Sequence, residues 1–243
     1  MGWGSCGTVT NISDETMPDS AFIFDIDGTL VDLRKTWEQT YTLLYQQKHN
    51  LILTPAELKS MFGPPELEGH TAILTRRNIY TPERAQELVT ATETTMVSIF
   101  NEANLFPSLL PGVFSCLHDF YQARVPLACA TGNIPSIGKA ILSAAKIAPY
   151  FSVVACSEPE TKARSDIVQR ALDGLRNQGN QLDLEKVYVI GDSPSDVTAA
   201  QQVGVKSVAV ATGHYSVEEL AAYHPNIVLK DLRGLSAAVE NFK

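Results

Sequence analysis

The chain has 243 residues, of which 44% are hydrophobic, so it can bury a full core as one large domain or as a domain with an insertion. Asp and Glu total 27 against 19 for Lys and Arg, a formal net charge of -8, and no basic run indicates nucleic acid as a partner. No apolar stretch approaches the roughly 20 residues that a membrane-spanning helix requires, so we expect no membrane partner either.

Neither the first residues nor the cysteines indicate export. Residues 1–20 lack the basic start and apolar segment of a signal peptide, and we expect a flexible tail there. Met17 leaves open whether all of this tail is native. The cysteines form no CxxC pair and have no histidine at zinc-ligand spacing, which favours free thiols and a cytoplasmic location. They are Cys6, Cys116, Cys129 and Cys156.

The segment Phe22–Leu30 predicts a buried strand that ends in two carboxylates, a glycine and a threonine. Because side chains alternate along an extended chain, Asp25 and Asp27 should point the same way at the end of the strand. Two like charges held this close need a cation, and carboxylate oxygens suit a hard ion such as Mg²⁺. Gly28 permits a sharp turn and Thr29 adds a hydroxyl, so we predict a metal site here.

Residues 34–106 should be all-helical, because apolar residues recur there at helical spacing and no strand pattern appears. Thr54-Pro55 and Thr81-Pro82 each place a capping hydroxyl before a proline and mark helix starts. Gly63–Pro65 and Gly69-His70 interrupt the pattern, and we expect these irregular parts to face the metal site. The histidine of the second pair is interpreted as a plain surface residue.

From Pro111 onward, strands and helices alternate. Apolar strands separated by helices indicate an α/β fold with a Rossmann-like parallel sheet, covered by helices on both faces. A lone strand at 21–27 is not stable without that sheet, so residues 21–33 and 107–243 should form one core, with 34–106 inserted as a helical cap. We expect strands at 125–130, 151–155, 187–190, 207–210 and 227–229, and helices at 135–145, 165–175, 195–203, 217–223 and 232–240.

Later strands of this sheet also end in residues that carry chemistry, and ligands of such sheets bind beyond the carboxyl ends of the strands. Asp192 follows the strand at 187–190 without an obvious local partner and is a third candidate metal ligand. Asp196 begins the next helix, where it either caps the helix or supports the metal site.

Two further segments bring groups suited to a phosphate. Thr131, Gly132 and Asn133 supply a hydroxyl, a backbone amide and a side-chain amide before a helix, although the same residues also suit an ordinary strand-to-helix turn. Lys162 precedes another helix and either brings a positive charge to the same edge or is a solvated loop lysine.

Over residues 21–243 the chain resembles the haloacid dehalogenase superfamily of phosphohydrolases. The resemblance lies in the order of its motifs: an acid pair, a small hydroxyl, a lysine and an acid cluster. The resemblance implies that Asp25 is the nucleophile and Asp27 the general acid and base. It implies that residues 34–106 are an α-helical cap and that the cofactor is Mg²⁺. The implied metal ligands are Asp25, Asp27 and Asp192, supported by Asp196, and the implied phosphate-binding residues are Thr131, Gly132, Asn133 and Lys162.

The implied roles agree with the physics of phosphoryl transfer. A carboxylate attacks phosphorus only where both negative charges are screened, which a metal and Lys162 would do. Asp27 would protonate the leaving alcohol and later deprotonate the water that hydrolyses the aspartyl phosphate. In this family the lysine is often followed by Pro-x-Pro, whereas Ala163, Arg164 and Ser165 follow it here. This departure leaves open whether Arg164 shares the cationic role.

The resemblance implies a Mg²⁺-dependent phosphatase that acts on a small phosphorylated metabolite. The segment Ala211–Leu220 resembles the phosphoglycolate phosphatase-like branch, which makes phosphoglycolate a candidate substrate. A phosphomutase of the beta-phosphoglucomutase kind shares the core motifs and is the alternative. A third hypothesis, a non-catalytic binding module, predicts the loss of Asp25, Asp27 or Asp192, and all three are present.

Overall fold

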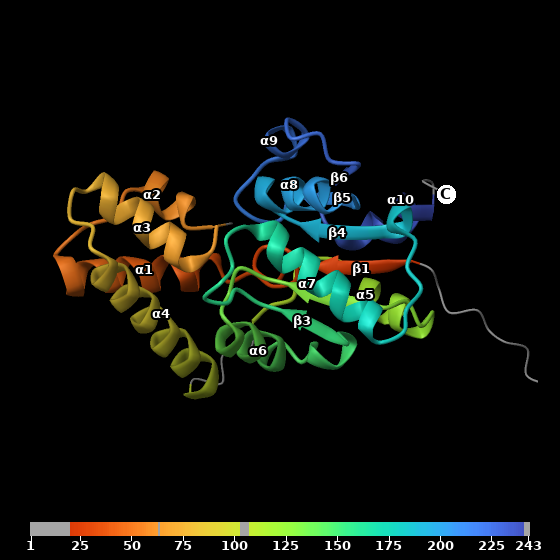
Figure 1. The fold of residues 1–243 in the computed structure, drawn as a ribbon, viewed down its shortest axis with the longest axis horizontal. Coiled ribbons are helices and arrows are strands. Elements are labelled where there is room, and N and C mark those ends of the chain that lie inside the picture. Colours follow the sequence, from red (N-terminus) through yellow and green to blue (C-terminus); the bar gives the residue numbers. More distant parts are fainter. Residues whose placement is uncertain (1–19, 63, 103–106, 241–243) are drawn as a thin grey trace, which may run out of the picture.

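The computed structural model describes residues 20–62, 64–102 and 107–240, and within them six parallel strands form one sheet in the order β3-β2-β1-β4-β5-β6 (Figure 1). The first strand of the chain lies near the centre of the sheet, where Phe22 pairs with Leu127 on one side and Tyr188 on the other. The strands are β1 Ala21–Phe24, β2 Leu127–Ala130, β3 Val153–Ala155, β4 Val187–Gly191, β5 Lys206–Val210 and β6 Ile227–Leu229.

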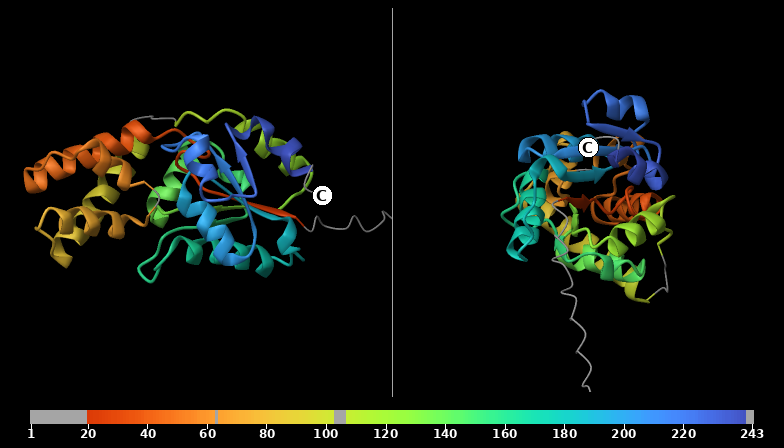
Figure 2. Two further views of the ribbon diagram at one scale, coloured as in Figure 1. Left: turned by 90° about the horizontal axis from the view of Figure 1, so that it is seen from above. Right: turned by 90° about the vertical axis from the view of Figure 1, so that its right-hand side faces the viewer.

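Helices cover both faces of the sheet (Figure 2). Because successive side chains of a strand point to opposite faces, Phe22 and Phe24 join one hydrophobic cluster while Ala21 and Ile23 join another. Helices α5 (Val113–Gln122), α6 (Pro135–Ala144) and α10 (Leu235–Glu240) contribute to the first cluster, which continues into apolar side chains of residues 37–100. Helices α7 (Arg164–Asn177) and α8 (Pro194–Val203) contribute to the second. The predicted parallel α/β fold with helices on both faces is confirmed.

Several elements are shorter than the sequence predicts. The strand expected at 125–130 begins at Leu127, because Pro126 has no N–H to donate to a strand ladder. The strand expected at 21–27 ends at Phe24, since the chain then turns and Gly28 N–H donates to Val31 O at 2.8 Å. Helix α9 covers Val217–Ala221, and short 3-10 turns lie at Ala148–Tyr150, Leu184–Lys186 and Leu232–Gly234.

Four helices between β1 and α5 form a separate group beyond the carboxyl end of β1 (Figure 1). They are α1 Arg34–His49, α2 Pro55–Ser60, α3 Glu66–Arg76 and α4 Pro82–Glu102. Helix α2 begins as predicted, since Thr54 Oγ1 accepts a hydrogen bond from Glu57 N–H at 3.3 Å and Glu57 Oε2 accepts one from Thr54 N–H at 2.8 Å. The group buries its own apolar side chains, including Leu88 and Met96.

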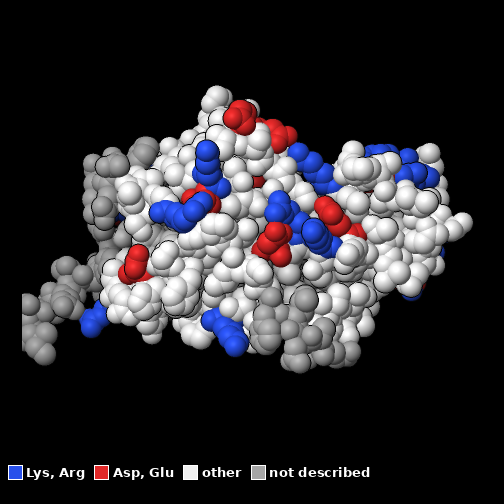
Figure 3. All heavy atoms as spheres, turned by 180° about the vertical axis from the view of Figure 1, so that it is seen from behind, with Lys and Arg blue, Asp and Glu red and all other residues white. Residues whose placement is uncertain are grey.

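Some expectations fall outside the described residues: the tail up to residue 19 with Cys6, Gly63, and residues 103–106. In the parts that the structure does describe, no helix combines the length and the apolar character needed to cross a membrane. On the face shown in Figure 3, described Lys and Arg side chains lie among Asp and Glu rather than in a patch of one sign.

Candidate active site

The end of β1 places two carboxylates at the mouth of a cavity between the sheet and the four inserted helices. Asp25 N–H donates to Ile190 O at 2.8 Å, so the sheet fixes its position. Gly28 has a φ of 80°, and a Cβ there would lie 2.5 Å from Asp192 Oδ2, so only glycine fits this turn. Thr29 is fully buried and does not line the cavity, which leaves its predicted contribution without support.

Asp25, Asp192 and Asp196 form a buried acid cluster in which one carboxylate oxygen from each lies within 4.8 Å of the others. The pKa of Asp25 is raised to about 7: burial is the largest cause, Arg164 acts against it, and the charges of Asp196 and Asp27 add to it. Burial, followed by the charges of Asp25 and Asp196, also holds the pKa of Asp192 well above its usual range. Such a cluster suits a hard divalent cation, whose charge would offset the mutual repulsion.

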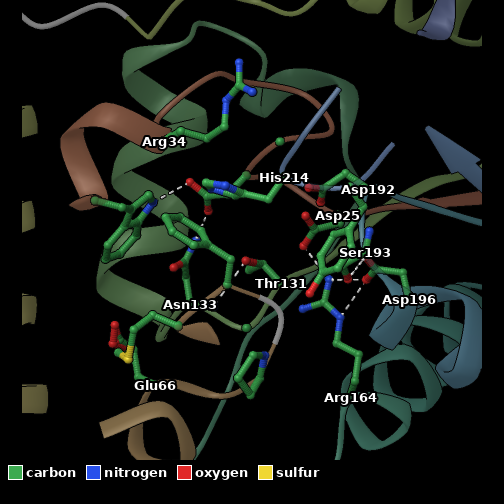
Figure 4. Close-up of a pocket in the computed structure, with 18 of the residues that line it drawn as sticks. Asp25, Arg34, Glu66, Thr131, Asn133, Arg164, Asp192, Ser193, Asp196 and His214 are labelled. Atoms are coloured by element: carbon green, nitrogen blue, oxygen red, sulfur yellow. Dashed lines mark hydrogen bonds and ion pairs between the residues drawn. The ribbon is translucent and has the colours of Figure 1, made fainter. Parts of the chain in front are cut away.

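Arg164, at the start of α7, supplies the positive charge beside the nucleophile candidate. Its guanidinium pairs with Asp25, donates from Nε to Asp196 Oδ1 at 3.0 Å, and donates to Ala130 O at 2.8 Å (Figure 4). Only 9% of the residue is exposed. The second oxygen of Asp196 accepts from Ser193 Oγ at 2.6 Å, so this carboxylate holds Arg164 and the start of α8 in place.

Lys162 does not lie in the cavity, contrary to the sequence prediction. Its side chain is exposed and lines a different depression, near Pro194 and Tyr223. The backbone N–H groups of Lys162 and Ala163 donate to Asp166 Oδ2 at 2.8 and 3.0 Å, which fixes the start of α7. This start turns the side chain two residues later, that of Arg164, toward β1.

Asp27 points to a different set of partners from Asp25. Trp37 Nε1 donates to Asp27 Oδ1 at 2.6 Å and Asn133 Nδ2 donates to Oδ2 at 2.5 Å. Burial raises the pKa of Asp27, while these two hydrogen bonds act to lower it. Asp27 is therefore outside the acid cluster, although the resemblance implied it as a metal ligand. Trp37 is a candidate functional residue that the sequence pattern did not indicate, because an aromatic residue at helical spacing indicates only burial.

Thr131, Gly132 and Asn133 line the same cavity as the two aspartates, and Figure 4 shows Thr131 and Asn133 there. Thr131 N–H donates to Ala155 O at 3.0 Å, and Thr131 Oγ1 accepts from Asn133 N–H at 3.2 Å. Thr131 is buried and lines the same cavity as the acid cluster. The structure thus brings these three residues together with the aspartates and with Arg164.

The inserted helices close the other side of the cavity with Trp37, Tyr41, Met61, Phe62 and Glu66, and Pro64 also lines it. The expectation that Gly69-His70 is irregular and faces the metal site is wrong, because both residues lie within α3 and neither lines the cavity. His70 is not a surface residue either: it is 0% exposed, and Tyr45 Oη lies 3.0 Å from its Nδ1.

The loop after β5 and the start of α1 complete the walls with His214, Tyr215 and Arg34. The ring of His214 lies against that of Phe62, with centroids 4.0 Å apart, so this loop contacts the inserted helices. The cavity holds about 70 Å³. This is well below the roughly 300–1,000 Å³ of most ligand pockets, so the cavity limits any ligand to a small one.

Comparisons with known proteins agree with this geometry. Residues 22–210 match the family described as haloacid dehalogenase-like hydrolase. Pyrophosphatase PpaX of Oceanobacillus iheyensis is 22% identical over 228 residues, which cover 89% of this chain and 95% of that protein. A phosphoglycolate phosphatase of Caulobacter vibrioides is 28% identical over 207 residues, which cover 82% of this chain and 83% of its own length.

A solved structure shows the same fold. The beta-phosphoglucomutase of Clostridium difficile superimposes with a TM-score of 0.77 at 20% identity, covering 92% of this chain and 96% of that one.

Proposed function

The chain belongs to the haloacid dehalogenase-like hydrolases, and from this premise we propose that it is a Mg²⁺-dependent phosphatase that hydrolyses a small phosphate monoester through an aspartyl-phosphate intermediate. The proposal rests on one observation: two buried aspartates of the same cavity have different surroundings. Asp25 lies against Arg164 and the acid cluster, whereas Asp27 is held by two hydrogen-bond donors. These environments suit a nucleophile and a proton-transfer group, respectively.

The acid cluster fits a bound Mg²⁺, with Asp25 and Asp192 as the carboxylates that would hold it and Asp196 as their support. When bound, the ion supplies positive charge that screens the nucleophile and the phosphoryl group. Arg164 provides further positive charge beside Asp25. We assign Arg164 the stabilising role that the sequence suggested for Lys162, because Arg164 contacts the nucleophile and Lys162 does not.

In the first half-reaction an oxygen of Asp25 attacks phosphorus, the phosphorus–oxygen bond of the ester breaks, and Asp27 donates a proton to the leaving oxygen. In the second, Asp27 takes a proton from a water molecule as that water attacks the aspartyl phosphate. Inorganic phosphate leaves and the Asp25 carboxylate is restored. Thr131 and Asn133 line the cavity beside both aspartates, and we assign them to the phosphoryl oxygens.

We propose the four inserted helices as a cap that closes over the substrate, since they supply one wall of the cavity. The names of the relatives, a pyrophosphatase and a phosphoglycolate phosphatase, support a small phosphorylated substrate. The cytoplasmic location also stays a proposal, which the buried free thiols of Cys116, Cys129 and Cys156 support.

Hydrolysis of p-nitrophenyl phosphate tests the proposed function. We expect activity with Mg²⁺, none with EDTA, and a loss of at least about a thousandfold in Asp25→Asn, since the nucleophile is removed. Asp119→Asn, at an exposed position of α5, is the matched control and should stay as active as the parent protein. A rapid quench followed by mass analysis should show one added phosphoryl group on the peptide that contains Asp25. Full activity in Asp25→Asn would contradict the mechanism.

The phosphomutase alternative is supported by the fold that the chain shares with beta-phosphoglucomutase. Sugar phosphates distinguish the two reactions. A phosphatase releases inorganic phosphate, whereas a mutase moves the phosphoryl group between hydroxyls of the sugar and releases none. We expect release of phosphate.

A further inference from the structure

Glu66 places a buried and half-satisfied carboxylate on the cap side of the cavity. It is 7% exposed and is the first residue of α3. Its Oε1 accepts a hydrogen bond from Tyr41 Oη at 2.5 Å. Its Oε2 is buried and has no hydrogen-bond partner among the described residues. A buried acceptor without a partner is costly, which indicates that a ligand supplies the missing donor.

The neighbouring histidine does not neutralise this carboxylate. His70 Nε2 lies 3.6 Å from Glu66 Oε2, beyond hydrogen-bond distance. The two ring nitrogens of His70 instead lie 3.0 Å from Tyr45 Oη and 3.4 Å from Thr92 Oγ1. Burial lowers the pKa of His70 to about 3, so the ring is neutral near pH 7. Glu66 Oε2 therefore remains available to a ligand.

The position of Glu66 assigns it to the leaving group rather than to the phosphoryl group. It lines the same cavity as Asp27 and Asn133. Figure 4 shows it on the side of the cavity away from Asp192 and Asp196. The phosphoryl group belongs beside Asp25, so the rest of the substrate extends past Asp27 toward Glu66.

We propose that Glu66 is a specificity-determining residue that accepts a hydrogen bond from a hydroxyl or ammonium group of the leaving alcohol. This inference rests on the proposed function. A leaving group that ends in a carboxylate, as in phosphoglycolate, would bring a negative charge to an unpaired carboxylate oxygen, where burial strengthens the repulsion. It also offers no donor to Oε2.

Arg34 is a cation that lines the same cavity, but its donors are already engaged. Its Nε and Nη2 donate to the two oxygens of Asp32 at 2.9 and 2.8 Å, and its Nη1 donates to Gly213 O at 3.1 Å. Figure 4 shows Arg34 at the opposite end of the cavity from Glu66. It does not offset the charge of Glu66.

Three esters with two-carbon leaving groups test the inference: 2-hydroxyethyl phosphate, phosphoethanolamine and phosphoglycolate. They differ at the second carbon of the leaving group, which carries a hydroxyl, carries an ammonium or is itself the carboxylate carbon. The assays are run at about pH 8, above the pKa of about 7 for Glu66, so that the carboxylate is ionised. We expect kcat/KM for the first two esters to exceed that for phosphoglycolate at least about tenfold, as one hydrogen bond to a charged group allows.

Glu66→Gln is the diagnostic variant because it keeps an oxygen for Tyr41 and presents N–H to the leaving group. The ratio of kcat/KM for phosphoethanolamine to that for phosphoglycolate should fall about tenfold or more. Glu68→Gln removes the same charge from an exposed position of α3 and is the matched control, whose ratio should equal that of the parent protein.

The outcomes separate the two proposals. Hydrolysis of p-nitrophenyl phosphate together with a preference for phosphoglycolate, or with no preference, overturns the role of Glu66 and leaves the phosphatase assignment in place. The kcat/KM ratios of the parent protein among the three esters test the role of Glu66 even if Glu66→Gln does not fold. No Mg²⁺-dependent hydrolysis of any of the four esters overturns the proposed function and this inference with it.

Discussion

Trp37 Nε1 donates a hydrogen bond to Asp27 Oδ1 over 2.6 Å, which ties the first inserted helix to the proposed acid-base residue. The indole is buried and stacks on Tyr41, with ring centroids 5.5 Å apart, so its direction is fixed by packing. Asn133, from the core, holds the other oxygen of Asp27. The orientation of Asp27 therefore depends both on the inserted helices and on the core that carries the sheet.

Replacing Trp37 with phenylalanine should move the pH dependence of catalysis. The Trp37 hydrogen bond lowers the pKa of Asp27, so its loss raises that pKa further. Because Asp27 must be protonated to assist the leaving group, the alkaline limb of kcat/KM should shift to higher pH. We expect kcat itself to fall about tenfold, since Asp27 loses its fixed orientation.

A pH profile of kcat/KM checks this prediction. Tyr41→Phe is the control. It keeps the ring that stacks on Trp37, and the hydroxyl that it removes donates to Glu66 rather than to Asp27. Its alkaline limb should coincide with that of the parent protein. An unshifted limb in Trp37→Phe would show that the indole does not tune Asp27.

Arg164→Ala should abolish most activity and destabilise the fold, whereas Lys162→Ala should do neither. Removing Arg164 leaves Asp25 and Asp196 buried without their cation, a change that typically costs about 3–5 kcal/mol of unfolding free energy. We expect kcat to drop at least about a hundredfold, as for loss of a charge that stabilises the transition state. Urea unfolding and p-nitrophenyl phosphate hydrolysis measure both effects. The reverse pattern would restore Lys162 as the stabilising residue.

Mg²⁺ should stabilise the folded protein measurably. With Mg²⁺ at about a hundred times its dissociation constant, binding to the folded state alone contributes about 2.7 kcal/mol and should raise the Tm by roughly 5–10 °C over the value in EDTA. Asp192→Asn should raise the Tm in EDTA, because it removes one buried like charge, and should shrink the Mg²⁺ response. Equal Mg²⁺ responses in the two proteins would exclude Asp192 as a ligand.

Glu66 should make stability depend on pH. Burial, the largest cause, raises the pKa of Glu66 from 4.5 to about 7 in the folded protein, so the folded state binds a proton that the unfolded state releases in this range. The stabilising contribution is complete below about pH 4.5 and is lost as the pH rises through about 7, a change of roughly 3 kcal/mol for such a shift.

Urea unfolding of the metal-free protein between these pH values measures this contribution. The unfolding free energy of Glu66→Gln relative to the parent protein should increase with pH over the window, since glutamine does not titrate. Glu68→Gln, at an exposed position, should give a curve parallel to that of the parent protein. A parallel curve for Glu66→Gln would mean that Glu66 titrates normally.

The sequence by itself determined the parallel α/β fold and the positions of Asp25, Asp27 and Asp192. Strands buried on both faces appear as continuous apolar runs, and helices appear through their spacing and their prolines. Residues just past the ends of such strands must meet at one edge of the sheet, so local pattern is enough to place these carboxylates together.

Only the tertiary structure decided which cation and which residues of the inserted helices reach these carboxylates. Lys162 and Arg164 lie two positions apart at the start of one helix, yet Lys162 is exposed while Arg164 is buried against Asp25 and Ala130 O. Trp37 and Glu66 lie on apolar helix faces. Such a face predicts that a side chain is buried but not which residues it contacts. Those contacts depend on how the inserted helices pack over the sheet, which residues far apart in the chain determine.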